Sequence, residues 1–135
     1  MTRTKTTRTQ EELFELATSM GLWGFVNNWN HYRSKSWIHK YLQQEFDARQ
    51  QRGLQRRAKA ANIGRYKPMA EFDWSWPKKI DKTLVQRLFS LDFIDNRENI
   101  ILLGNSGTGK TMIAKNLGAH AVAEGHKVLF TTATA

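Results

Sequence analysis

The amino-acid sequence predicts an α/β protein in which an incomplete parallel sheet follows a small, basic, all-α N-terminal domain. Apolar positions recur at helical spacing through residues 10–62. A strand-like stretch at residues 99–103, apolar from Ile100 to Leu103, is then followed by a glycine-rich loop, a helical stretch and a second strand-like stretch at residues 127–132. We therefore predict a basic helical domain at residues 1–67, a linker with a short helix at residues 68–98, and the start of a sheet domain at residues 99–135.

Charge separates these regions. The chain of 135 residues carries 21 Lys and Arg against 12 Asp and Glu, a net charge of +9, and ten of the basic residues but only two acidic ones lie within residues 31–67. Such an excess favours a polyanionic partner, with nucleic acid ahead of an anionic membrane surface. No cysteine is present, which excludes disulfides and thiolate metal sites. The longest apolar run is too short to span a bilayer, so we expect a soluble, cytoplasmic protein without a membrane partner.

Two helices are predicted in the N-terminal half. Thr9 and Glu12 have the spacing of a capping box, and Gly21 is a natural stop for the short helix that this box begins. We interpret residues 22–36 as turns, with a broken helical turn as the alternative, followed by a second, longer helix from about Ser34 or Ser36 to about Asn62. The aromatic residues between and beside these helices could stack on bases, but we favour a small helical core.

The second helix carries basic residues at intervals of three and four. Arg49, Arg52, Arg56 and Lys59 form a ridge of positive charge, and with Arg57 they are our predicted DNA contacts. The alternative is a solvated helix face that other acidic residues balance.

Residues 104–111, GNSGTGKT, match the pattern G-x-x-x-x-G-K-[ST] of phosphate-binding loops in P-loop NTPases. Glycines let successive backbone N–H groups turn inward around a phosphate, and the helix that follows presents its positive dipole end. In this interpretation Lys110 contacts the β- and γ-phosphates, and the Thr111 hydroxyl ligates Mg²⁺. The predicted nucleotide-binding residues are Gly104, Asn105, Ser106, Gly107, Thr108, Gly109, Lys110 and Thr111.

Hydrolysis requires further residues, and the sequence does not identify them. An acidic residue at the end of a later apolar strand normally orders Mg²⁺, but none follows Glu124. The earlier stretch LDFID at residues 91–95 is interpreted as the end of a helix and a turn. Two strands also cannot close a parallel sheet, so we expect a chain truncated within its nucleotide domain and leave its ATPase activity and catalytic residues open.

With these elements in order, the chain resembles the IstB-like ATP-binding proteins, the helper ATPases of two-gene bacterial insertion sequences. These are relatives of the DnaC-type helicase loaders in the AAA+ group. The resemblance rests on QEFDARQQRGLQRRAKAANIGRYKPMAEFDWSWP at residues 44–77, which is similar to the Glu/Arg-rich helix and FD-S-P linker of that family, and on the glycine-loop unit at residues 92–133. It covers most of residues 9–135.

The resemblance implies ATP and Mg²⁺ binding at residues 104–111 and ATP-dependent homo-oligomeric assembly on double-stranded DNA. It also implies stimulation of a transposase, with the N-terminal helical part touching DNA or that transposase. The acidic strand, sensor residues and arginine finger of the family are absent from this chain. Two alternatives are a helicase loader of the DnaC type and a non-hydrolysing DNA-binding fragment with a vestigial loop.

Overall fold

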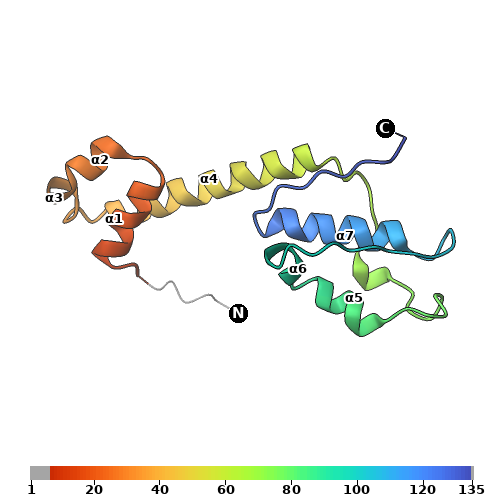
Figure 1. Cartoon of the computed structure of the whole chain (residues 1–135). Helices are drawn as coiled ribbons and strands as arrows, with labels where there is room; N and C mark the ends of the chain where they lie inside the picture. Colours follow the sequence, from red (N-terminus) through yellow and green to blue (C-terminus); the bar gives the residue numbers. More distant parts are fainter. Residues whose placement is uncertain (1–6, 135) are drawn as a thin grey trace. The chain divides into compact units, whose positions relative to one another are not determined.

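The computed structural model describes residues 7–134 (Figure 1). Residues 1–6 of the predicted N-terminal domain and residue 135 of the predicted sheet domain lie outside the described residues. The elements are α1 (Gln10–Ser19), α2 (Trp23–Asn27), α3 (Trp29–Tyr32), α4 (Ile38–Ala61), the 3-10 helix η1 (Met69–Glu71), α5 (Lys82–Leu88), α6 (Asp92–Asp95) and α7 (Lys110–Ala123). The chain divides into two compact units, and the division falls within α4, between Gly53 and Leu54. The predicted domain boundaries after residues 67 and 98 stay predictions.

The first unit begins with the predicted capping box. The Thr9 hydroxyl accepts a hydrogen bond from the backbone N–H of Glu12 at 3.2 Å, and a Glu12 carboxylate oxygen accepts one from the backbone N–H of Thr9 at 2.7 Å. The box satisfies two of the donors that a helix start leaves unpaired. At the other end of α1, Gly21 has a φ of 68°, a left-handed conformation in which a side chain would be strained.

The core of the first unit joins α1 to the first turns of α4. Its buried side chains are Leu13, Leu16, Ala17, Met20, Ile38 and Leu42. Aromatic residues from α2 and α3 pack against this cluster, and the rings of Phe25 and Tyr32 stack with centroids 4.9 Å apart. Each fully buried aliphatic side chain contributes roughly 1.5–3 kcal/mol to folding. The aromatic stretch therefore supplies core packing, although Trp23 and Trp37 remain at least half exposed.

The second unit is built around α7. Its buried side chains are Phe72, Val85, Leu91, Ile113, Leu117 and Ala121, which come from the linker, α5, the turn before α6, and α7. The N-cap of α5 is Asp81, whose carboxylate accepts the backbone N–H of Leu84 at 2.9 Å. Gly125 follows α7 with a φ of 99°, a left-handed conformation that suits the end of a helix.

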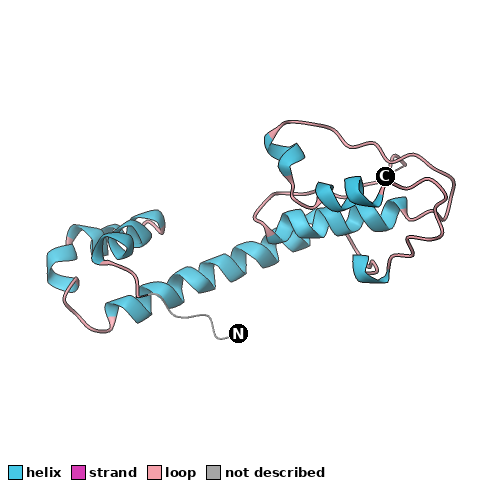
Figure 2. Cartoon of the chain, turned by 90° about the horizontal axis from the view of Figure 1, so that it is seen from below, coloured by secondary structure: helices cyan, strands magenta, loops and turns pink. Residues whose placement is uncertain are grey.

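The prediction of a parallel sheet is wrong. No strand occurs among residues 7–134, and Figure 2 shows only helices and loops there. In residues 99–103 and 127–132, side chains alternate between packed and exposed positions. Ile100, Leu102 and Val128 pack against the second core. Ile101 and Leu103 are 79% and 90% exposed. Both runs are therefore covered on one side only, not on both faces as their composition suggested.

The physical reason is that a strand requires a neighbouring strand to pair with its backbone. The backbone N–H of Phe130 donates instead to the carbonyl of Ala61 at 2.7 Å. That carbonyl belongs to the last turn of α4, where carbonyls have no partner within the helix. The second apolar run thus caps a helix, and apolar composition alone does not reveal this partner.

No helix within the described part of the chain combines the length and apolar character that crossing a bilayer requires.

The capping box can be tested by replacing Thr9. We expect Thr9→Ala to lower the free energy of unfolding by about 1 kcal/mol, because the backbone N–H of Glu12 loses the hydroxyl that accepts its hydrogen bond. Thr9→Ser keeps the hydroxyl and should remain within a few tenths of a kcal/mol of the parent chain. Urea denaturation followed by circular dichroism measures both, and equal stabilities for the two variants would contradict a role for the cap.

Candidate functional site

The glycine loop is held against the start of α7 (Figure 1). Gly107 and Gly109 have φ values of 78° and 93°, so two of its glycines adopt conformations that other residues rarely reach. Gly109 is also the N-cap of α7, and the loop runs directly into the helix. The first backbone N–H groups of a helix have no partner within it and carry the positive end of its dipole, which together suit an anion.

Lys110 lies across this loop. Its ammonium donates to the carbonyl of Gly104 at 2.7 Å and to the carbonyl of Asn105 at 2.6 Å, and lies 3.5 Å from the Thr108 hydroxyl. The Thr108 hydroxyl itself donates to the Asn105 carbonyl at 2.8 Å. The structure thus places a full positive charge at the centre of the loop, where the carbonyls of the loop satisfy its donors.

The remaining predicted residues lie in the loop and in the first turn of α7. Asn105, Ser106 and Gly107 are exposed, and Thr111 is exposed in the first turn of α7. Accessible backbone, a central ammonium and a hydroxyl in the following turn are the groups that a triphosphate with Mg²⁺ requires. The residues present therefore fit such a ligand.

The linker before α5 packs on the loop from the side of the second core. Phe72 is only 8% exposed. A Cβ atom placed on Gly109 would lie 2.5 Å from Cε2 and 3.0 Å from Cζ of the Phe72 ring, so the ring rests directly on the glycine backbone. Two features therefore require glycine at position 109: its positive φ and the close approach of the Phe72 ring.

Hydrogen bonds also hold the segment that precedes Phe72, from residue 65 onward, along α7. Lys115 Nζ donates to the carbonyl of Arg65 at 3.1 Å, and the Asn116 amide donates to the carbonyl of Lys67 at 2.8 Å. Asn116 also donates to the carbonyl of Met112 at 2.8 Å, which fixes its orientation on the helix. Residues 65–72 are therefore attached to α7 by polar contacts at one end and by the Phe72 ring at the other.

Beyond Phe72, the linker continues into a local turn. The Asp73 carboxylate accepts from the Ser75 hydroxyl at 2.5 Å and from the Ser75 backbone N–H at 3.0 Å. The hydroxyl contact, followed by the backbone one, lowers the pKa of Asp73 below its ordinary value. The Trp74 ring lies 4.6 Å from the Phe72 ring, and the Lys82 ammonium lies 5.2 Å from the centre of Trp74. The turn thus anchors the aromatic pair on α5.

A cavity of about 490 Å³ opens beside the loop. Its volume is in the range of small-molecule sites. One wall is formed by loop residues, including Gly104, Thr108 and Lys110, and another by Lys78 and Lys79 of the linker. Ile101 and Leu103 also line the cavity and make part of its surface apolar.

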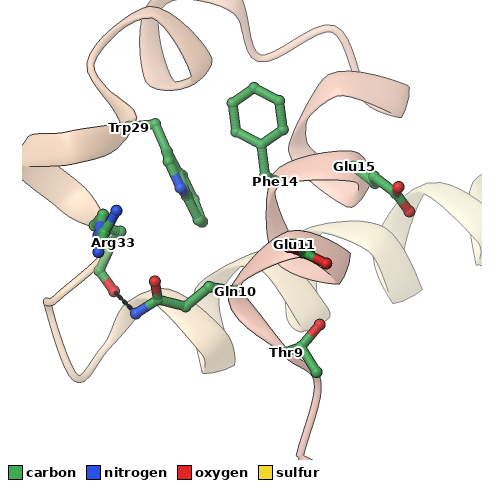
Figure 3. Close-up of a pocket in the computed structure, with 7 residues that line it drawn as sticks. All are labelled: Thr9, Gln10, Glu11, Phe14, Glu15, Trp29 and Arg33. Atoms are coloured by element: carbon green, nitrogen blue, oxygen red, sulfur yellow. Dashed lines mark hydrogen bonds between the residues drawn. The ribbon is translucent and has the colours of Figure 1, made fainter.

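A second hollow, of about 640 Å³, belongs to the first unit (Figure 3). Phe14 and Trp29 meet edge to face with centroids 5.5 Å apart, and the carboxylates of Glu11 and Glu15 lie on the same helix as Phe14. Arg33 also lines the hollow, but the two carboxylates outnumber it, and the net negative charge of the lining disfavours a nucleotide phosphate.

The predicted DNA contacts on α4 have unequal surroundings. Arg49 donates to the Glu45 carboxylate at 2.7 Å and also to the carbonyl of Met20, and Arg52 lies 3.8 Å from the same carboxylate. The hydrogen bond from Arg49 lowers the pKa of Glu45 below its ordinary value. Within the second unit, Arg57 is half-buried and donates to the carbonyl of Val122 at 3.4 Å.

Arg56 and Lys59 are exposed. These two side chains, together with the largely exposed Arg52, are the basic groups of α4 most accessible to a polyanion.

Sequence patterns locate the loop but not the contact between Phe72 and Gly109. The structure shows Phe72 of the FDWSW stretch packed in the second core against the loop. The only sequence signal for this is the pairing of an aromatic residue in the linker with a glycine at a helix start.

The sequence pattern of the family described as "IstB-like ATP binding protein" matches residues 7–135. The chain belongs to this family. The match includes the glycine loop, both units and the linker between the loop and α4.

Individual relatives agree with this IstB-like assignment. The chain is 45% identical over 89 residues to a Pseudomonas aeruginosa protein described as an ATP-binding protein of insertion sequence IS21, covering 66% of this chain and 34% of that protein. It is 34% identical over 96 residues to the corresponding IS5376 protein of Geobacillus stearothermophilus, covering 71% and 38%. A Bacteroides fragilis IS21-like protein is 33% identical over 91 residues, covering 67% and 46%. The chain thus spans between a third and a half of the length of these relatives.

The double constraint on Gly109 is testable against Gly107. Both glycines have a positive φ, so alanine at either position costs about 1–2 kcal/mol of backbone strain. A Cβ on Gly107 meets open space, whereas one on Gly109 meets the Phe72 ring. We expect Gly109→Ala to destabilise the chain clearly more than Gly107→Ala in urea denaturation. Equal losses would show that the ring imposes no constraint.

Proposed function

We propose that residues 104–111 bind the triphosphate of ATP with Mg²⁺, as the nucleotide site of a helper protein for DNA transposition. The observation that carries the proposal is the Lys110 ammonium at the centre of a loop with two left-handed glycines, directly before α7. Membership in a family of ATP-binding proteins supports ATP as the nucleotide, and the relatives described as insertion-sequence proteins support transposition.

Each residue of the loop has a role in this proposal. The backbone N–H groups around Gly107 and Gly109 donate to phosphate oxygens. Lys110 leaves the carbonyls of the loop and neutralises the β- and γ-phosphates. The Thr111 hydroxyl would hold Mg²⁺, which would supply positive charge against the phosphates.

The basic part of α4 is proposed as a contact to the phosphates of double-stranded DNA. Arg52, Arg56 and Lys59 are exposed, and they recur on one side of the helix. Arg49 and Arg57 contribute their charge, but part of their hydrogen-bonding capacity is used within the protein. Contacts of this kind are independent of sequence and weaken steeply with salt.

In the proposal, ATP binding promotes homo-oligomeric assembly on DNA and stimulation of a transposase. The matched relatives are described as insertion-sequence proteins, and this favours a transposition helper over a helicase loader. Enrichment of a replicative helicase instead of a transposase in a pull-down would reverse that preference.

The nucleotide site is tested by Lys110→Ala. Loss of two charge-assisted hydrogen bonds should weaken binding of Mg²⁺–ATP on the order of a hundredfold. ATP-dependent loading onto DNA should be lost as well. Lys127→Ala removes an exposed lysine outside the loop and serves as the matched control. Titration with a fluorescent ATP analogue measures both variants, and unchanged affinity of Lys110→Ala would refute the site.

The DNA face is tested by the double variant Arg56→Ala, Lys59→Ala. We expect weaker binding to duplex DNA of any sequence, and the slope of log affinity against log salt should decrease by about 1 for each phosphate that the variant no longer neutralises. The double variant Lys40→Ala, Lys127→Ala is the matched control, because it removes two exposed lysines that are not among the proposed DNA contacts. An equal effect of the control would mean that net charge alone governs binding.

A further inference from the structure

Phe72 connects the linker to the glycine loop through a contact that the proposed nucleotide site does not itself require. The three atoms nearest to a Cβ position on Gly109 all belong to the Phe72 ring, at 2.5, 3.0 and 3.6 Å. The ring is 8% exposed and belongs to the core that holds α7. The backbone of Gly109 therefore has little room to move toward the linker.

Gly109 is also the residue at which the glycine loop joins α7. It is the N-cap of the helix at a φ of 93°, and the backbone N–H of Ile113 donates to its carbonyl at 3.0 Å. A change in its dihedral angles would rotate the loop relative to the N–H groups of the first helical turn. Both sets of N–H groups must point at the same phosphates, so their relative orientation decides the affinity.

The linker is itself held in place on both sides of Phe72. Its polar attachments to α7 at Arg65 and Lys67 precede the ring, and the turn of Asp73 and Ser75 follows it. The Trp74 ring packs on Phe72 with centroids 4.6 Å apart. A displacement of Gly109 would consequently require a shift of residues 72–75, which these contacts hold in place.

We propose that Phe72 is a positioning residue for the phosphate loop, and that the FDWSW segment at residues 72–76 responds through it to nucleotide binding. This inference rests on the proposed nucleotide site. It adds that the ring of Phe72 maintains the conformation of Gly109 that binds phosphate. Phosphate bound at the loop restrains Gly109 in turn, and this restrains the ring and the turn that follows it.

Nucleotide affinity of Phe72→Leu and Phe72→Ala tests the positioning role in the full chain. Leucine keeps an apolar side chain in the core but removes the ring atoms that touch Gly109. We expect both variants to bind a fluorescent ATP analogue at least about tenfold more weakly than the parent, because the loop is no longer preorganised. Phe93→Ala is the matched control, since Phe93 packs against the same core from α6.

Thermal melting of the same variants separates positioning from general stability. We expect Phe93→Ala to lower the melting temperature and leave nucleotide affinity within twofold of the parent. If affinity instead follows the melting temperature across all three variants, Phe72 is only a packing residue and the inference is overturned. Parent-like affinity in Phe72→Leu would overturn it as well.

Amide hydrogen exchange tests the response of the linker and does not depend on any Phe72 variant folding. Saturating Mg²⁺–ATP should slow exchange at residues 71–76 in the parent chain, and the same addition to Lys110→Ala should leave it unchanged. Unchanged exchange in the nucleotide-bound parent would overturn the coupling.

The two proposals fail in different ways. A parent chain that binds no nucleotide refutes the nucleotide site and the inference together. A parent chain that binds nucleotide, loses it on Lys110→Ala and keeps it on Phe72→Leu refutes the role of Phe72 alone.

Discussion

The apolar stripe of α7 must be shielded from water, and the second unit is arranged around that constraint. Ile113, Leu117 and Ala121 recur every four residues and are at most 7% exposed. Their cover comes from segments that are distant in sequence, including Phe72 of the linker and Val85 of α5. Because α7 is held along this stripe, the start of the helix and the loop before it have a defined position. The phosphate-binding geometry is therefore a consequence of core packing as much as of the glycines.

The Lys110 ammonium of the proposed site finds its hydrogen-bond acceptors within the loop itself. The Lys110 ammonium is held by the carbonyls of Gly104 and Asn105, so a phosphate competes with the backbone of the loop for the lysine. The basic residues of α4 follow a different pattern. Glu45 engages Arg49 and lies near Arg52, whereas Arg56 and Lys59 are exposed. This contrast explains why the predictions for DNA binding concentrate on the exposed pair.

Local sequence predicted α1, α4 and α7 but not the short helices α2 and α3, and it predicted a sheet that is absent from residues 7–134. The capping box at Thr9 and the stop at Gly21 act over a few residues, and both predictions are confirmed. A strand depends on a partner elsewhere in the chain. Residues 99–103 have strand composition, but within the described residues they form no ladder, and every second side chain remains exposed.

The sequence by itself therefore determined the positions of the main helices, the glycine loop with Lys110, and the uneven distribution of charge. These follow from residue types at short spacing, where backbone geometry fixes which groups meet. Only the tertiary structure decided that Phe72 rests on Gly109 and that the backbone of Phe130 caps α4. Such contacts join residues that are far apart along the chain, and they form because burial of apolar side chains and pairing of backbone groups are satisfied across the whole unit.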